Sequence, residues 1–178
     1  MDRGFSLVEV LVASTLMTLG LIGLAQLSVA SIRLNHVARQ TTMATGLATQ
    51  KVHALKTLSW AFDPAGTAVS DTTTDLTVAP EQPAGGTGLT PSPPDALVQN
   101  TRGYVDFLDE FGRALGGGPA PPTGVAYVRR WSIDPLALPD TIVLQVSVTA
   151  LSSGGGGPSV RRRPEEARFV VVKTRKSG

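Results

Sequence analysis

The sequence predicts an α+β protein in which a long N-terminal membrane helix packs on a small antiparallel β-sheet head. Three observations lead to this prediction. Residues 10–32 carry no charge. A helical pattern of apolar residues continues this run, and no proline occurs before Pro64. The last third of the chain contains segments in which apolar and polar residues alternate, as in half-buried strands.

Composition narrows the classes of protein that fit. The chain has 178 residues, enough for one modest head, and it contains no cysteine. A disulfide scaffold, a cysteine nucleophile and a thiolate metal site are therefore excluded. The 19 glycines and 13 prolines predict long loops. A formal net charge of +2 gives no global reason to expect a nucleic-acid partner.

Residues 10–32 are long enough to cross a bilayer. At about 1.5 Å per helical residue they span roughly 34 Å, close to the ~30 Å hydrocarbon core. We therefore expect the membrane half of the helix to cover residues 5–32. A cleaved secretory signal fits less well, because the apolar segment continues without a break and contains the Glu9 carboxylate. An ordinary single-pass anchor is a further alternative.

The N terminus carries a specific motif, GFSLVEVLVA at residues 4–13. It resembles the cleavage and methylation motif of type IV prepilins, in which a small residue precedes the cut, Phe follows it and Glu is the fifth residue of the mature chain. The resemblance implies that a prepilin peptidase removes residues 1–4 by cutting between Gly4 and Phe5, and that Phe5 is then N-methylated. It also implies that Glu9 pairs with the α-amino group of a neighbouring subunit, since opposite charges in a dry core are tolerated as a pair.

The apolar pattern after the membrane run predicts an amphipathic helix over residues 33–60. One helix over residues 5–60 would be roughly 84 Å long. The apolar stripe consists of Leu34, Val37, Ala38, Ala44, Leu47, Ala48, Val52, Leu55 and Leu58. The polar remainder includes Arg33, His36, Arg39, Gln40, Gln50, Lys51, His53 and Lys56. Residues 44–60 also resemble V-type minor pilins and the I-type pseudopilins of secretion systems.

The head is expected to begin after residues 63–66 (DPAG), which should end the helix. Residues 61–103 form a Thr/Pro/Gly-rich loop region, a surface loop or a poorly ordered one, with one short strand at residues 74–79. Residues 104–178 are expected to form the antiparallel β head. Its strands are predicted near residues 103–108, 125–133, 141–151 and 167–174.

The strand at residues 125–133 has an unusual face. Alternation puts Arg129 on the same face as Tyr127 and Trp131. We expect the Arg129 head group to lie at an edge or to reach water. Trp131 is expected to anchor the core beneath the helix.

No set of residues forms a convincing catalytic constellation, so the chain is predicted to be a structural protein without a cofactor, not an enzyme. Asp106, Asp109 and Glu110 could bind calcium, but three acids near a turn are expected to be merely solvated. His36 and His53 are too far apart along the helix to hold one metal. We therefore predict no metal site.

Basic residues are concentrated after Ser159: Arg161, Arg162, Arg163, Arg168, Lys173, Arg175 and Lys176. They could form a patch for DNA or for an acidic neighbouring subunit. A solvated hairpin arm and tail is the expected arrangement, and nucleic acid is not an expected partner.

The resemblance predicts a structural minor pilin subunit of a type IV pilus that helps to prime or modify filament assembly. A minor pseudopilin of a type II secretion system is the alternative. A single-pass membrane-anchored adhesin or ligand-binding domain is the alternative from another class. The implied partners are other pilin or pseudopilin subunits, the prepilin peptidase and an inner-membrane assembly platform. The implied location is the inner membrane, with a cytoplasmic N terminus and a periplasmic head, and then the pilus or pseudopilus.

Overall fold

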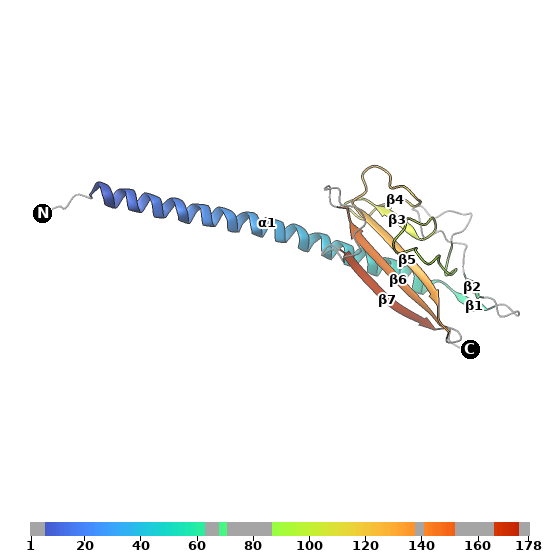
Figure 1. Cartoon of the computed structure of the whole chain (residues 1–178). Helices are drawn as coiled ribbons and strands as arrows, with labels where there is room; N and C mark the ends of the chain where they lie inside the picture. Colours follow the sequence, from blue (N-terminus) through green and yellow to red (C-terminus); the bar gives the residue numbers. More distant parts are fainter. Residues whose placement is uncertain (1–5, 63–67, 71–86, 138–140, 152–165, 175–178) are drawn as a thin grey trace. The chain divides into compact units, whose positions relative to one another are not determined.

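The computed structural model describes residues 6–62, 68–70, 87–137, 141–151 and 166–174. Within them, one long helix, α1 (Leu7–Thr57), precedes every strand (Figure 1). The strands are β1 (Trp60–Phe62), β2 (Ala68–Ser70), β3 (Val105–Leu108), β4 (Ala114–Gly116), β5 (Tyr127–Pro135), β6 (Thr141–Ala150) and β7 (Glu166–Thr174). The predicted α+β class, with a long apolar N-terminal helix and an antiparallel sheet, is confirmed.

The chain divides into two compact units, Met1–Arg39 and Gln40–Gly178. In the first unit, Ser6 caps the start of α1. Its Oγ accepts a hydrogen bond of 3.2 Å from the backbone N–H of Glu9, and a Ser three residues before a Glu is the sequence of a capping box. Glu9 lies in the first turn, where the helix dipole favours a carboxylate.

Four hydroxyl groups in the membrane half of α1 bond to the backbone of the same helix. Ser14 donates to the carbonyl oxygen of Leu11, and Ser28 donates to that of Leu24, both at 3.0 Å. Thr15 and Thr18 make the same kind of bond at 2.8 Å. These residues therefore carry little unsatisfied polarity into an apolar environment. By length and composition α1 can cross a membrane.

In the second unit, residues 40–57 of α1, here called the docked half, pack on one face of a five-stranded sheet. The strand order is β4-β3-β5-β6-β7, and every neighbouring pair is antiparallel. The helix contributes Ala44, Leu47, Ala48, Val52 and Leu55 to the core, as the predicted stripe requires, whereas Leu34 is exposed. The core face of the sheet is called the inner face.

The long strands follow the predicted alternation. On β6, Ile142, Leu144, Val146, Val148 and Ala150 are buried on the inner face. Trp131 on β5 is 1% exposed and belongs to the same core, as expected. The sequence did not predict β1, β2 or β4, which have three residues each. The predicted strand at residues 74–79 lies outside the described residues.

The helix ends earlier than predicted, at Thr57, and Trp60 belongs to β1. Lys173 of β7 donates hydrogen bonds to the backbone carbonyl groups at this end of the helix. Its Nζ donates to the carbonyl oxygens of Lys56, at 2.9 Å, and of Leu58. Carbonyl groups at a helix C terminus lack helical partners, so this ammonium group caps α1 from the last strand.

Part of the predicted loop region packs on the head. The Ser92 N–H donates to the Ile133 carbonyl oxygen at 3.0 Å, and the Ile133 N–H donates to Ser92 Oγ at 3.0 Å. Ser92 therefore provides hydrogen-bond partners for the backbone N–H and C=O groups of Ile133, where β5 extends beyond the end of β3. Leu89 and Ala96 are buried in the core, so this part of the loop region is attached to the sheet.

Candidate functional site

The N-terminal segment is the first candidate site. The predicted cleavage and methylation residues, Gly4 and Phe5, lie outside the described residues, whereas Glu9 is exposed in the first turn of α1. In the described chain, the Glu9 carboxylate makes no ion pair. Its neighbours Leu7 and Val8 are 82% and 70% exposed. A carboxylate at the start of such an apolar surface needs a partner when water is removed.

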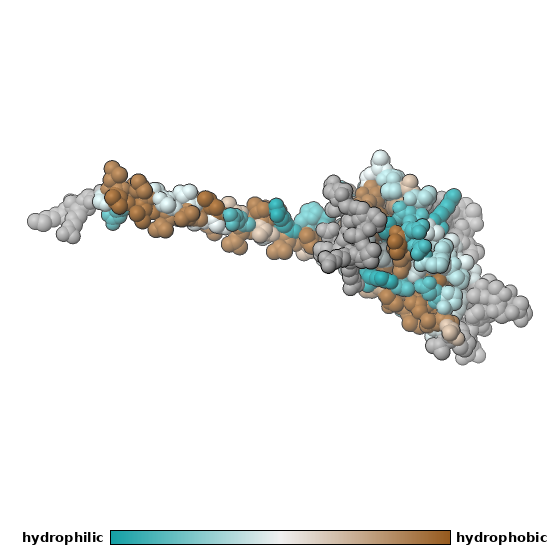
Figure 2. All heavy atoms as spheres, viewed as in Figure 1, coloured by the Kyte–Doolittle hydropathy of each residue, from teal (hydrophilic) through white to brown (hydrophobic). Residues whose placement is uncertain are grey.

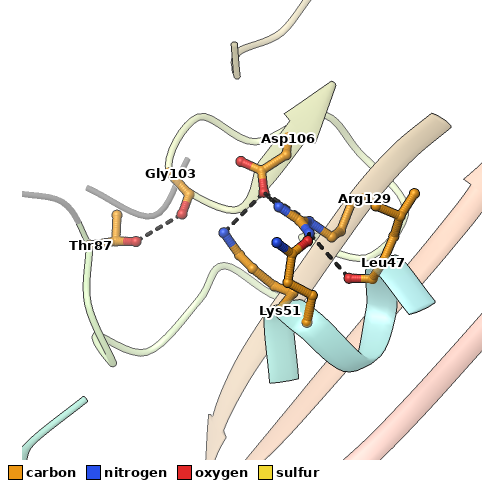
Figure 3. A network of polar contacts seen from close by, with 7 residues as sticks. Leu47, Lys51, Thr87, Gly103, Asp106 and Arg129 are labelled. Carbon is orange, nitrogen blue, oxygen red and sulfur yellow. Dashed lines mark hydrogen bonds and ion pairs between the residues drawn. The ribbon is translucent and has the colours of Figure 1, made fainter. Parts of the chain in front are cut away.

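The second candidate site is a cluster of buried charges between α1 and the sheet, drawn in Figure 3. Asp106 of β3 is the only acid in it, and its Oδ2 lies 3.0 Å from Lys51 Nζ of α1. The same oxygen accepts hydrogen bonds from Arg129 Nη2 at 2.6 Å and Nε at 3.0 Å. The side chains of Lys51, Asp106 and Arg129 are 2%, 1% and 9% exposed. We call these three residues the charge cluster.

Further contacts tie the charge cluster to α1. The Arg129 guanidinium donates from Nη1 to the carbonyl oxygen of Leu47 at 3.1 Å and to Gln50 Oε1 at 3.2 Å. The Lys51 ammonium lies 3.6 Å from the centroid of the Trp131 ring, a cation–π contact. Since Asp106 and Arg129 are cross-strand partners of β3 and β5, three elements meet at one carboxylate.

The charge cluster contains two formal positive charges and one negative charge in a buried region. Burial removes hydration from all three groups, so the hydrogen bonds and the Coulomb attraction must offset a large desolvation cost. Asp106 Oδ1 is buried and has no hydrogen-bond partner among the residues that the structure describes. Removing the carboxylate would leave two cations in the core, so Asp106 is the residue on which the cluster depends.

The structure corrects two expectations here. Arg129 was expected at an edge or with its head group in water, but it is 8% exposed, because Asp106 lies opposite it on the inner face. Lys51 was assigned to the polar side of the helix, but it is buried, because its ammonium reaches Asp106. Lys51 is four residues from both Leu47 and Leu55, so its position in the buried stripe is visible in the sequence. Its partner is not.

The three acidic residues considered as calcium ligands have different contacts in the structure. Asp106 belongs to the charge cluster. Asp109 accepts backbone hydrogen bonds from Phe111 at 2.9 Å and Arg113 at 2.8 Å, and it pairs with Arg113 Nε at 2.7 Å. Desolvation raises the pKa of Asp109, but the hydrogen bonds from Arg113 and Phe111 outweigh it and lower the pKa below its ordinary value. Glu110 is exposed, and the described residues contain no group of three His, Asp or Glu suited to a metal ion.

The remaining candidates are dispersed. His36 and His53 are both exposed on α1. Arg168 donates from Nη2 to Gln145 Oε1 at 2.6 Å, and Lys173 caps α1. Residues 161–163 and 175–176 of the predicted basic set lie outside the described residues.

One comparison with known proteins gives a match. Residues 1–25 match the family model described as the prokaryotic N-terminal methylation motif. The matched segment contains the predicted cleavage site, Glu9 and the first half of the apolar run. No curated protein and no solved structure matches the chain.

Proposed function

We propose that this chain, whose N-terminal methylation motif supports a type IV pilin-like family, is a minor pilin that helps to prime or modify the assembly of a type IV pilus. The motif at residues 1–25 carries the proposal. It points to a structural subunit of the pilin or pseudopilin type. The apolar helix that starts at Leu7 fits the single-pass inner-membrane anchor typical of pilins.

In the proposed maturation, a prepilin peptidase cuts between Gly4 and Phe5, and Phe5 is then N-methylated. The new amine is four residues from Glu9. Both charges enter apolar surroundings, where each is costly alone and tolerable in a pair. Glu9 would therefore pair with the amine of a neighbouring subunit during assembly. The Glu9 carboxylate is exposed and has no ion-pair partner among the described residues, which supports this role.

The head would then face the periplasm, and an inner-membrane assembly platform would move the subunit into the filament. Within the second unit, the charge cluster joins the docked half of α1 to β3 and β5. A force or displacement on this part of the helix would therefore be passed directly to the sheet.

A minor pseudopilin of a type II secretion system is the second candidate, because the methylation motif is common to both kinds of subunit. The chain has no proline in the membrane half of the helix, where major pilins commonly have one. This difference favours a minor component. The size of the head, residues 61–178, favours the pilus over an I-type pseudopilin.

The test of the proposal is the intact mass of the membrane-extracted protein. We expect it to lack residues 1–4 and to carry one extra methyl group on Phe5. A Gly4→Leu variant is the matched control, because a bulky side chain before the cut should block the peptidase and leave Met1 in place. A wild-type protein that keeps Met1 in cells with an active prepilin peptidase would overturn the family assignment and the function together.

A further inference from the structure

The buried face of the docked half of α1 nearly repeats itself every four residues. Apolar side chains cover much of the surface of α1 in the first unit (Figure 2), whereas in the docked half they form two rows against the core of the head. One row consists of Met43, Leu47, Lys51 and Leu55, and the other consists of Ala44, Ala48 and Val52. Residues four apart lie on the same side of a helix, about 6 Å apart along its axis. Within these rows, a shift of α1 by four residues therefore exchanges apolar residues for apolar residues except at Lys51.

The sheet distinguishes only weakly between such positions through its apolar side chains. Strand β6 lines the inner face with five aliphatic residues, Ile142, Leu144, Val146, Val148 and Ala150. Apolar contacts are not directional, and a core tolerates the exchange of one aliphatic residue for another of similar volume. Apolar burial thus decides which side of α1 meets the sheet, but it says little about how far along the sheet the helix lies.

The charge cluster, in contrast, is sensitive to this position. Lys51 Nζ lies 3.0 Å from Asp106 Oδ2, and Arg129 Nη1 donates to Gln50 Oε1 at 3.2 Å. A shift by four residues would put Lys51 in the place of Leu47 or Leu55, and its ammonium would be buried away from Asp106. The loss of a buried counter-charge should lower the population of the shifted helix roughly 100-fold or more.

The end of α1 provides a second polar contact that depends on position. Lys173 Nζ donates to the carbonyl oxygens of Lys56, at 2.9 Å, and of Leu58. A shift of α1 toward its N terminus would withdraw these carbonyl groups from Lys173 and draw the last turn away from β1, which begins at Trp60. Lys173 therefore opposes the same displacement as the charge cluster, from the other end of the docked half.

We propose that the charge cluster, together with Lys173, fixes the position of the docked half of α1 along the sheet. The buried charges select one register of the helix among several that apolar packing accepts. Buried polar groups have this effect in coiled coils, where a single polar residue specifies the register of the helices. This role does not depend on cleavage at Gly4 or on filament assembly, because every contact in it lies within the second unit.

Distance measurements between two spin labels test the proposal. The chain has no cysteine, so introduced cysteines can be labelled specifically in the full-length protein in detergent. One label replaces His53, which is exposed on α1. The other replaces Arg168 or Val172, which are exposed toward opposite ends of β7. A shift of α1 along the sheet changes the two distances unequally, whereas unfolding of the head broadens both.

Lys51→Met makes the first row wholly apolar and leaves the pair of Asp106 and Arg129 intact. Leu55→Met is the matched control, because it changes the next residue of the same row without removing a charge. We expect one distance for each label pair in the wild-type protein and in Leu55→Met. In Lys51→Met we expect a second distance from a shifted helix in at least about a tenth of the molecules, and in more of them when Lys173→Met is added.

Replacing the whole charge cluster with Lys51→Met, Asp106→Leu and Arg129→Met provides a second measurement in which no charge of the cluster remains buried. This triple variant should show the same second distance. A single wild-type distance in the triple variant and in Lys51→Met with Lys173→Met would overturn the proposal, because apolar packing alone would then fix the register. A second distance in Leu55→Met as abundant as that in Lys51→Met would also overturn it, since altered packing and not the lost charge would then cause the shift.

Discussion

Replacing Asp106 with alanine should destabilise the head strongly. The carboxylate of Asp106 is 1% exposed and holds the ammonium of Lys51 and the guanidinium of Arg129. Its removal leaves two buried cations without a counter-charge, which costs about 3–5 kcal/mol. A domain is typically stable by about 5–15 kcal/mol, so the loss takes a large share of the free energy of unfolding. The corresponding fall in melting temperature is roughly 6–20 °C.

The assay is denaturant unfolding of the full-length chain in detergent, followed by tryptophan fluorescence from Trp60 and Trp131, the second of which contacts Lys51. Two variants make the result interpretable. Arg113→Met breaks an ion pair in which Arg113 is 75% exposed, and it should lower the free energy of unfolding far less than Asp106→Ala does. Replacing the whole charge cluster with Lys51→Met, Asp106→Leu and Arg129→Met should be neutral, or stabilising by about 1–4 kcal/mol.

The reasoning fails if Asp106→Ala unfolds within about 1 kcal/mol of the wild-type protein. It also fails if the triple replacement is as destabilising as Asp106→Ala, because the cost would then come from lost packing and not from unpaired charge.

Three further predictions concern the ends of α1 and one turn of the head. Glu9→Leu should remain folded and membrane-inserted but enter filaments poorly, with Glu9→Asp between it and the wild type; wild-type amounts of Glu9→Leu in sheared filament fractions would contradict charge pairing. Lys173→Met should lower the free energy of unfolding by about 0.3–1 kcal/mol, because the helix loses its cationic cap. It should also speed amide hydrogen exchange at the end of α1. Unchanged exchange there would show that the cap has no effect. The lowered pKa of Asp109 contributes stability that is present above its unfolded value of 3.8 and is lost as pH falls through the folded pKa. Asp109→Asn should therefore flatten the acid side of the stability–pH curve, and an unchanged acid side would count against this role.

The sequence predicted the elements whose signal is local. The helix follows from an apolar run that continues into a stripe, and the long strands follow from alternation that is clearest in β6. The cap that Ser6 provides for Glu9 is also local, with donor and acceptor three residues apart, but it was not predicted. Strands of three residues, such as β4, are too short to carry a periodic signal.

The charge cluster could not be predicted because its partners are distant in sequence. Lys51 and Asp106 are 55 residues apart, and Asp106 and Arg129 are 23 apart. A lysine in a helical stripe and an arginine on the inner face of a strand each look misplaced alone, and only the fold brings both to one carboxylate. The earlier expectation for Arg129 was wrong for this reason. The cap on α1 was missed in the same way, since Lys173 is 117 residues from Lys56.

The hydroxyl groups in the membrane half of α1 have a consequence for how easily the helix changes its surroundings. Ser14, Thr15, Thr18 and Ser28 all bond to carbonyl oxygens of the same helix. These bonds travel with the helix, so moving it from lipid to a protein interface breaks none of them. Under the proposed function Glu9 is different, because its carboxylate would exchange one environment for a specific partner. Entry into an assembly would thus leave these four hydrogen bonds intact, and its selectivity would come from a single carboxylate.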